Sequence, residues 1–206
     1  MHMIPVIQNR LNSISNRLMP EVTGLILAAG NSLRFGKKNK LLSILENKPL
    51  IVHSINSLQS CDQTLVIIRE QELSAIQKIV ASTRATIIVN PNAEQGMSTS
   101  IIAGVKASKE SAGWCILPAD MPFIRVETCN KVIKSLKEGN NITAPYNHSQ
   151  RGHPVGISHK YIKQLLALQG DTGARSILNA RDIRQLHVDD PGILKDIDFE
   201  QDLKIN

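Results

Sequence analysis

The sequence predicts an α/β protein with three layers, α/β/α, around a mostly parallel, Rossmann-like sheet. Continuous apolar runs recur along the chain, and such runs are typical of strands that are buried on both faces. Stretches with apolar residues at helical spacing separate the runs. Because strands that alternate with helices form parallel sheets covered on both sides, the pattern indicates this layered architecture.

Four strands and four helices follow from the pattern. The first strand is a short apolar run that ends in glycine, and the second is the β-branched run TLVII. In one helical stretch, Leu73, Ile76 and Val80 recur on a single face. The predicted strands are 22–28, 64–68, 85–89 and 114–117, and the predicted helices are 49–60, 71–82, 97–110 and 126–138.

The two ends of this pattern set the expected domain organisation. Residues 1–20 contain polar breaks and some helical spacing, so we expect a helical or flexible extension outside the main fold. Residues 21–206 are expected to form a single domain. Residues 139–157 are rich in turn formers, which predicts a loop or lid between short strands.

Composition excludes several classes of protein. Hydrophobic residues make up 42% of the 206, enough for a packed core, which excludes a disordered chain. No apolar run approaches the ~20 residues of a membrane span. Aromatic residues are only 3%, which counts against a stacking platform for nucleic acid. The three cysteines show no CxxC spacing, so we expect free thiols and a cytoplasmic protein.

The positive charge is concentrated near the first predicted strand. Residues 1–60 carry seven basic and two acidic side chains, most of the basic ones within 34–48, whereas the whole chain has a net charge of +6. A nucleic-acid binder more often spreads its charge over a face. A local basic cluster beside glycines suggests a phosphate site instead.

Three loops that follow predicted strands contain the candidate chemistry: AAGNSLRFGKKNK, NPNAEQGMS and PADMP. In such sheets ligands bind beyond the carboxyl ends of the strands. The first loop fits neither a Walker A motif nor GxGxxG. Its small residues still allow close approach of a ligand, and Arg34 and Lys40 suit a polyphosphate. A glycine turn followed by a solvated basic loop is the alternative.

Asp120 and His153 are the other side chains that the residues alone single out. Asp120 directly follows a buried strand, which suits a metal-binding carboxylate, although it could instead cap the next helix. His153 precedes a proline, where a structural hydrogen-bonding role is the alternative to ligand binding.

The first loop, LAAGNSLRFGKKNKLL, resembles the signature LAAGxSxRFGxxxKLL of MobA-like nucleotidyltransferases. Further blocks resemble the same family in the same order: NPNAEQGMSTSIIAGV, CILPADMPFI, RGHPVGIS, GDTGARSIL and DIDFEQDL. The similarity runs from about Val22 to Leu203 and is greatest to the molybdenum cofactor cytidylyltransferase (MocA-type) branch. It implies the fold of nucleotide-diphospho-sugar transferases.

The resemblance also implies roles for individual residues. Asp198 would be the second metal position and Asp196 its alternate, although Phe199 and Glu200 replace the family's Thr-Pro and either aspartate could instead cap the last helix. A helix N-terminus with Ser98 near the cap is the alternative for the GMS segment. The implied sets are Arg34, Lys40 and Asp120 for catalysis; Leu27, Ala28, Ala29, Gly30, Ser32, Arg34, Lys40, Gly96, Met97, Ser98 and Asp120 for the nucleotide; Asp120 and Asp198 for Mg²⁺; and Arg151, His153, Asp171 and Arg175 for the acceptor.

The function that the resemblance implies is transfer of CMP from CTP to molybdenum-bound molybdopterin, with release of pyrophosphate. Ala29 favours CTP, because LAAG accompanies cytidine use in the family and its Cβ narrows the base pocket. A transient partner would be an apo-molybdoenzyme of the xanthine dehydrogenase type, and neither nucleic acid nor membrane is expected. The alternatives are a GTP-using enzyme, transfer to a sugar or alcohol phosphate, and a non-catalytic cofactor-delivery protein.

Overall fold

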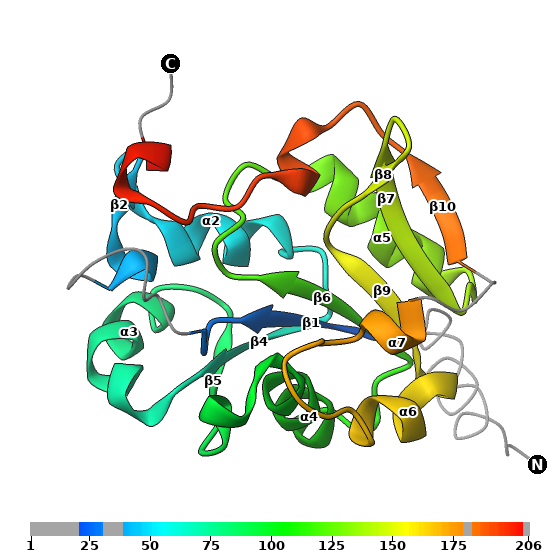
Figure 1. Ribbon diagram of the computed structural model, residues 1–206, viewed down its shortest axis with the longest axis horizontal. Coiled ribbons are helices and arrows are strands. Elements are labelled where there is room, and N and C mark those ends of the chain that lie inside the picture. The colour runs from blue at the N-terminus through cyan, green and yellow to red at the C-terminus, as the bar shows by residue number, and fades with distance from the viewer. Residues whose placement is uncertain (1–20, 31–38, 179–182, 204–206) are drawn as a thin grey trace, which may run out of the picture.

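The computed structural model describes residues 21–30, 39–178 and 183–203, so the predicted extension at 1–20 lies outside the described residues. The main sheet has eight strands in the order β10-β7-β9-β6-β1-β4-β5, with β8 paired to β7 (Figure 1). The strands are β1 (Val22–Leu27), β4 (Gln63–Ile68), β5 (Thr86–Val89), β6 (Gly113–Pro118), β7 (Ile142–Asn147), β8 (Gln150–Arg151), β9 (Val155–Ser158) and β10 (Ile183–His187).

Most strands of this sheet run in one direction. β1 pairs in parallel with β4 and β6, β4 with β5, and β7 with β10. Only β8 and β9 run antiparallel to their neighbours. The prediction of a mostly parallel sheet is confirmed, and the carboxyl ends of six strands therefore lie at one edge.

Helices cover both faces of the sheet, which confirms the three-layer prediction. Figure 1 shows α2 and α5 on one side and α4 and α6 on the other. Each face has its own apolar cluster; α3 packs with α2 and α5, and α7 with α4 and α6. The helices are α2 (Leu50–Ser57), α3 (Leu73–Val80), α4 (Met97–Ala107), α5 (Val126–Lys137), α6 (Ile162–Leu166) and α7 (Arg175–Leu178).

The central strands are apolar throughout because alternate side chains enter opposite cores. On β1, Leu25 packs into the α4 side and Ile26 into the α2 side, and neither is exposed to solvent. Trp114 on β6 is also fully buried, and its indole nitrogen donates to the Ser108 hydroxyl at 3.0 Å. These strands form a rigid base for the loops that follow them.

The strand order fixes where a ligand can bind. From β1 the chain moves outward to β4 and β5, and then returns across β1 to β6 on its other side. The order therefore reverses between β1 and β6, and open α/β sheets bind ligands at such a switch point. The loops that follow β1 and β6 are those that contain Lys40 and Asp120.

The later part of the chain contains more elements than the sequence indicated. Residues 139–157 hold the short strands β7 and β8, the start of β9 and the loops between them, in agreement with the predicted loop between short strands. β10 and helices α6 and α7 are additional elements that we did not predict. No helix in the described ranges has the length and apolar character needed to cross a membrane.

Candidate active site

Lys40 lies between two carboxylates at the switch point. Its ammonium nitrogen is 2.8 Å from Oδ2 of Asp120 and 3.5 Å from Oδ1 of Asp198. The lysine side chain is only 9% exposed, against 26% for Asp120 and 36% for Asp198. Three residues that are far apart in sequence thus form one charged cluster at the carboxyl edge of the sheet.

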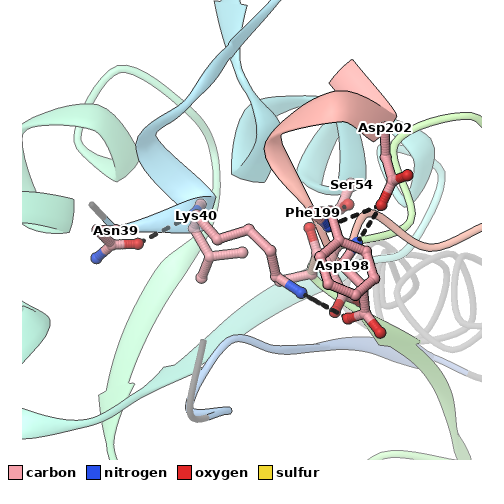
Figure 2. Close-up of polar contacts among 9 residues, drawn as sticks. Asn39, Lys40, Ser54, Asp198, Phe199 and Asp202 are labelled. Atoms are coloured by element: carbon pink, nitrogen blue, oxygen red, sulfur yellow. Dashed lines mark hydrogen bonds and ion pairs between the residues drawn. The ribbon is translucent and has the colours of Figure 1, made fainter. Parts of the chain in front are cut away.

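A short 3-10 helix, η2 (Lys40–Leu42), holds the backbone of Lys40. The Asn39 side chain caps this turn by accepting a hydrogen bond from the Leu41 amide at 3.0 Å, and Leu41 is buried in the core. Figure 2 shows the Lys40 side chain extending from this turn toward Asp198. The turn therefore fixes the start of a side chain that is mostly buried and ends at the two carboxylates.

Asp120 is positioned by the end of β6. The Ala119 amide donates to the Leu27 carbonyl of β1 at 3.0 Å, and the Ala119 carbonyl accepts from the Ser54 hydroxyl at 2.8 Å. The alternative role as a helix cap is wrong, because α5 begins at Val126 with Arg125 at its N-cap. Asp120 thus directs its carboxylate to the cluster instead of to a helix end.

The backbone of Asp120 also holds the C-terminal segment. The Ile197 amide donates to the Asp120 carbonyl at 2.9 Å, and Ile197 is completely buried. On the other side of Asp198, the Asp202 carboxylate accepts from the amides of Asp198 and Phe199 at 2.9 and 2.7 Å. The Phe199-Glu200 departure from the family pattern therefore leaves Asp198 beside Lys40.

Asp196 lies at the exposed margin of the same cluster. Its pKa is raised above the ordinary value, chiefly by desolvation and then by the charges of Asp120 and Asp198. The positive charge of Lys40 lowers the same pKa, but the lysine makes its ion pairs with Asp120 and Asp198. Asp198, which contacts Lys40, is thus the better placed of the two candidates.

A cavity of about 570 Å³ opens beside Asp120 and contains most of the predicted nucleotide residues. Three predicted residues are not among those that line it. Ala28 is buried with its amide bonded to the Ile67 carbonyl, the Ser98 hydroxyl donates to the Gln169 carbonyl, and Lys40 contacts Asp120, which lines the cavity. Ser32 and Arg34 lie outside the described residues. The predicted residues that line the cavity are Leu27, Ala29, Gly30, Gly96, Met97 and Asp120.

The helix N-terminus beside this cavity already has partners. The amide of Met97, the first residue of α4, donates to Oδ1 of Asp171 at 2.9 Å, and the Ser98 amide donates to the Gly170 carbonyl at 3.2 Å. Gly96 is the N-cap, so Ser98 lies near the cap, as the helix-terminus alternative has it. The assignment of Gly96, Met97 and Ser98 to the nucleotide stays a prediction, and in this arrangement the two amides are already hydrogen-bonded within the protein.

A second cavity, of about 440 Å³, adjoins the first. All four predicted acceptor residues line it, namely Arg151, His153, Asp171 and Arg175. The two cavities share wall residues, which are Leu27, Met97, Pro118 and Asp171. A ligand in one cavity would therefore lie next to a ligand in the other.

His153 is the most perturbed titratable group in the second cavity. Burial lowers its pKa to about 4, and the positive charge of Arg151 acts in the same direction. The negative charge of Asp120 opposes this shift, as does a backbone hydrogen bond at Ile116. The Nδ1 atom is buried without a hydrogen-bond partner. The ring is thus neutral near pH 7 and retains one unused polar atom.

The other predicted acceptor-binding residues differ in the hydrogen bonds that they already make within the protein. Arg151 donates to the Leu178 carbonyl at 3.0 Å, so part of its guanidinium is already used. The Asp171 carboxylate bonds to Met97 rather than to Arg175. Sequence reasoning missed Ser54 and Asp202, whose roles depend on contacts with residues far away or on a turn at the end of the chain.

A larger cavity, of about 850 Å³, lies at the opposite end of the sheet, near the start of β4 and β5. Its ionisable residues include Asp62, whose carboxylate bonds to the Val22 amide and to Lys137. The Asp62 carboxylate is thus already engaged by the protein itself. It is therefore a weaker candidate than the two adjoining cavities.

Comparison with known proteins finds similar sequences among molybdenum cofactor nucleotidyltransferases and in a protein named as an oxidoreductase. This chain is 26% identical over 185 residues to the molybdenum cofactor cytidylyltransferase of Escherichia coli (strain K12), covering 89% of this chain and 94% of that one. It is 26% identical over 172 residues to nicotine blue oxidoreductase of Paenarthrobacter nicotinovorans, covering 79% and 84%. It is 24% identical over 146 residues to the molybdenum cofactor guanylyltransferase of Aliivibrio fischeri (strain MJ11), covering 70% and 73%.

Solved structures share the fold. Rv0371c from Mycobacterium tuberculosis H37Rv superposes with a TM-score of 0.76 at 23% identity, covering 88% of this chain and 95% of that one. A complex of Rv0371c with manganese from the same organism gives a TM-score of 0.67 at 20% identity, covering 82% and 88%.

The sheet order and the charged cluster at its carboxyl edge define an α/β protein of the nucleotide-binding class. Residues 24–187 match the MobA-like NTP transferase domain. The chain therefore belongs to this family and is a nucleotidyltransferase, which confirms the predicted family and class of enzyme.

Proposed function

We propose that this protein transfers CMP from CTP to the phosphate of molybdenum-bound molybdopterin, giving molybdopterin cytosine dinucleotide and pyrophosphate. An oxygen of the acceptor phosphate forms a bond to the α-phosphorus of CTP, and the bond from that phosphorus to pyrophosphate breaks. The observation that carries the proposal is the pair of adjoining cavities with a shared wall. CTP would occupy the cavity beside Asp120, and the acceptor would occupy the cavity beside His153.

Lys40 has a role that requires charge but no proton transfer. A phosphate acceptor is already ionised near pH 7, so the reaction needs no general base, and catalysis comes from positioning and charge neutralisation. The Lys40 ammonium would contact the triphosphate and stabilise the pyrophosphate as it leaves. Arg34 would supply a second cation from the same loop, by resemblance alone.

The residues present fit a magnesium ion. Asp120 and Asp198 both reach one ammonium group, so their oxygens are spaced to share a single cation. No three His, Cys, Asp or Glu side chains within the described ranges form a metal-ligand group, but Mg²⁺ usually takes only one or two carboxylates, with waters and phosphates. The manganese complex of the Mycobacterium protein supports a divalent cation. When bound, the ion would neutralise charge on the phosphates.

The second cavity has the charges that a phosphorylated pterin requires. Arg151 and Arg175 would bind the acceptor phosphate, and the neutral ring of His153 would hydrogen-bond to the acceptor through its unpartnered Nδ1. Asp171, which lines both cavities, would lie between the two bound ligands. These roles agree with those that the family resemblance implies.

Ala29 supports CTP as the donor. It is 6% exposed and lines the nucleotide cavity, where its Cβ reduces the room for a purine. The similarity to a cytidylyltransferase supports the same choice. A guanylyltransferase is also similar, so the choice of base needs a direct measurement.

We further propose that the product passes to an apo-molybdoenzyme of the xanthine dehydrogenase type in the cytoplasm. Cys61, Cys115 and Cys129 are free thiols in the structure, which agrees with a reducing compartment. Binding of the purified protein to such an apo-enzyme, before and after loading with product, tests the partner.

The decisive experiment measures pyrophosphate released by the full chain with molybdenum cofactor, Mg²⁺ and either CTP or GTP. We expect release with CTP that depends on the cofactor, and several-fold less with GTP. A preference for GTP contradicts the cytidylyl assignment. Pyrophosphate release that needs no molybdenum cofactor, or that occurs with a sugar phosphate instead, contradicts the assignment of molybdopterin as the acceptor.

A further inference from the structure

The contacts of Lys40 combine two roles that the proposed function keeps apart. Lys40 is to bind the triphosphate, and Asp120 with Asp198 is to bind the metal, yet the ammonium of Lys40 contacts both carboxylates at 2.8 and 3.5 Å. Each carboxylate has lone pairs for more than one partner, but a divalent cation bound to these oxygens would lie within a few ångströms of the ammonium, and the two positive charges repel each other. Each therefore weakens binding of the other at this site.

We propose that Lys40 competes with the divalent cation for the carboxylates of Asp120 and Asp198, and that the triphosphate ends this competition by drawing the ammonium onto its own oxygens. Nucleotide binding then frees the carboxylates for the metal, so that each ligand strengthens binding of the other. This inference deepens the proposed function and rests on it, because it assumes the triphosphate and metal sites named above.

The structure allows the ammonium to move while its surroundings remain fixed. The backbone of Lys40 is anchored by the Asn39 cap and by buried Leu41. Asp120 is bound through its carbonyl to the Ile197 amide, and Asp198 through its amide to the Asp202 carboxylate. The movable part is therefore the lysine ammonium on its flexible stem, while the backbones of Asp120 and Asp198 are held by these bonds.

The charge of the cluster gives the direction of the effect. Two carboxylates and one ammonium leave a single negative charge. Removing the lysine charge strengthens the negative potential at the carboxylates and removes the competing cation. Metal binding in the absence of nucleotide should therefore become tighter, the opposite of the result for a lysine that merely supports the fold.

The test measures binding of Mn²⁺ alone to the full-length protein, from the electron paramagnetic resonance signal of free Mn²⁺. We expect Lys40→Met and Lys40→Gln to bind Mn²⁺ about tenfold more tightly than wild type, since a unit charge at ~4 Å has an effect of this order or larger. Lys40→Arg, which keeps the charge, should bind no more tightly than wild type.

Two further variants locate the effect. Lys137→Met is the matched control, because Lys137 pairs with Asp62 at 2.9 Å at the other end of the sheet; its Mn²⁺ affinity should equal that of wild type. Adding Asp198→Asn to Lys40→Met should remove most of the gain. Circular dichroism confirms that each variant is folded.

Unchanged or weaker Mn²⁺ binding in both Lys40→Met and Lys40→Gln overturns the proposal, and so does an equal gain in Lys137→Met. Failure of the proposed function has a different signature. In that case wild type releases no pyrophosphate from CTP with molybdenum cofactor, whatever the Mn²⁺ affinities are. CTP-dependent release by wild type without a gain in the Lys40 variants rejects the competition alone.

Discussion

The Asp171 carboxylate accepts a hydrogen bond from the Met97 amide at 2.9 Å across 74 residues of sequence. This bond joins a loop of the acceptor cavity to the first turn of α4, which borders the nucleotide cavity. The neighbouring bond from the Ser98 amide to the Gly170 carbonyl strengthens the same connection. Two hydrogen bonds therefore join these loops into one connected unit.

We expect Asp171→Ala to loosen this unit. Without the carboxylate, the Met97 amide loses its hydrogen-bond partner at the first turn of α4, which should lower the free energy of unfolding by about 1 kcal/mol, as for other helix N-caps. It should also speed hydrogen exchange of the Met97 and Ser98 amides. Asp171→Asn is the control, because its side-chain oxygen still accepts a hydrogen bond. Unchanged exchange rates in Asp171→Ala contradict the role.

Gly96 provides a second test of the same contact. Its φ is +106°, and a Cβ there would lie 2.5 Å from the Gly170 carbonyl oxygen. Gly139 has a similar φ of +89° but no atom within 4 Å of its Cβ position. Both alanine variants incur backbone strain of about 1–3 kcal/mol. Gly96→Ala should be destabilised more than Gly139→Ala in urea unfolding, and equal losses would argue against the close packing.

The parts of the fold that the sequence predicted are those with a local signature. β1, β4 and β6 are largely buried on both faces, and edge strand β5 keeps a continuous β-branched run although it is only partly buried. These apolar runs stand out in the sequence, and their predicted bounds agree with the structure within one or two residues. β10 pairs only with β7 at the sheet edge and exposes Arg184 and Gln185. Its mixed pattern therefore resembles a polar loop.

The candidate site divides in the same way. Lys40 and Asp120 were predictable as neighbours, because they follow adjacent strands whose carboxyl ends meet at one edge. Asp198 was reached only through the family resemblance, since its place depends on the bond from Ile197 to Asp120. The bond between Asp171 and Met97 has no sequence signal, because it depends on how two distant loops pack.

Asp120 offers the most direct test of catalysis. We expect Asp120→Asn to lower kcat/KM for CTP by at least about 10²-fold, because it removes charge at the phosphates and the metal. The backbone bonds of residue 120 remain, so the variant should stay folded by circular dichroism. Glu138→Gln, on an exposed residue paired with Lys134, is the control and should keep full activity. Wild-type activity in Asp120→Asn removes the assigned role.

Ala29 is expected to set part of the preference for a pyrimidine. Ala29→Gly removes a Cβ from the nucleotide cavity and should lower the ratio of kcat/KM for CTP over GTP, by a factor that corresponds to about 1 kcal/mol. Ala28→Gly is the matched control, since Ala28 is buried and does not line the cavity. An unchanged ratio in Ala29→Gly, or an equal change in Ala28→Gly, assigns base selection to other residues.

His153 makes stability depend on pH in a predictable direction. Its pKa is about 4 in the folded protein, mainly because of burial, and about 6.5 in an unfolded chain. Between these values the unfolded chain binds a proton that the folded protein does not, so stability is lost as the pH falls from 6.5 to 4.

Carboxylates also titrate in this window, so the informative quantity is the difference between wild type and His153→Gln. Wild type should lose about 2 kcal/mol more than the variant between pH 7 and pH 4 in urea unfolding, a value reduced for the partial exposure of the ring. Parallel curves would mean that the histidine protonates in the folded state. In that case it would enter the acceptor cavity as a cation beside Arg151, and its hydrogen-bonding role at neutral charge would have to be abandoned.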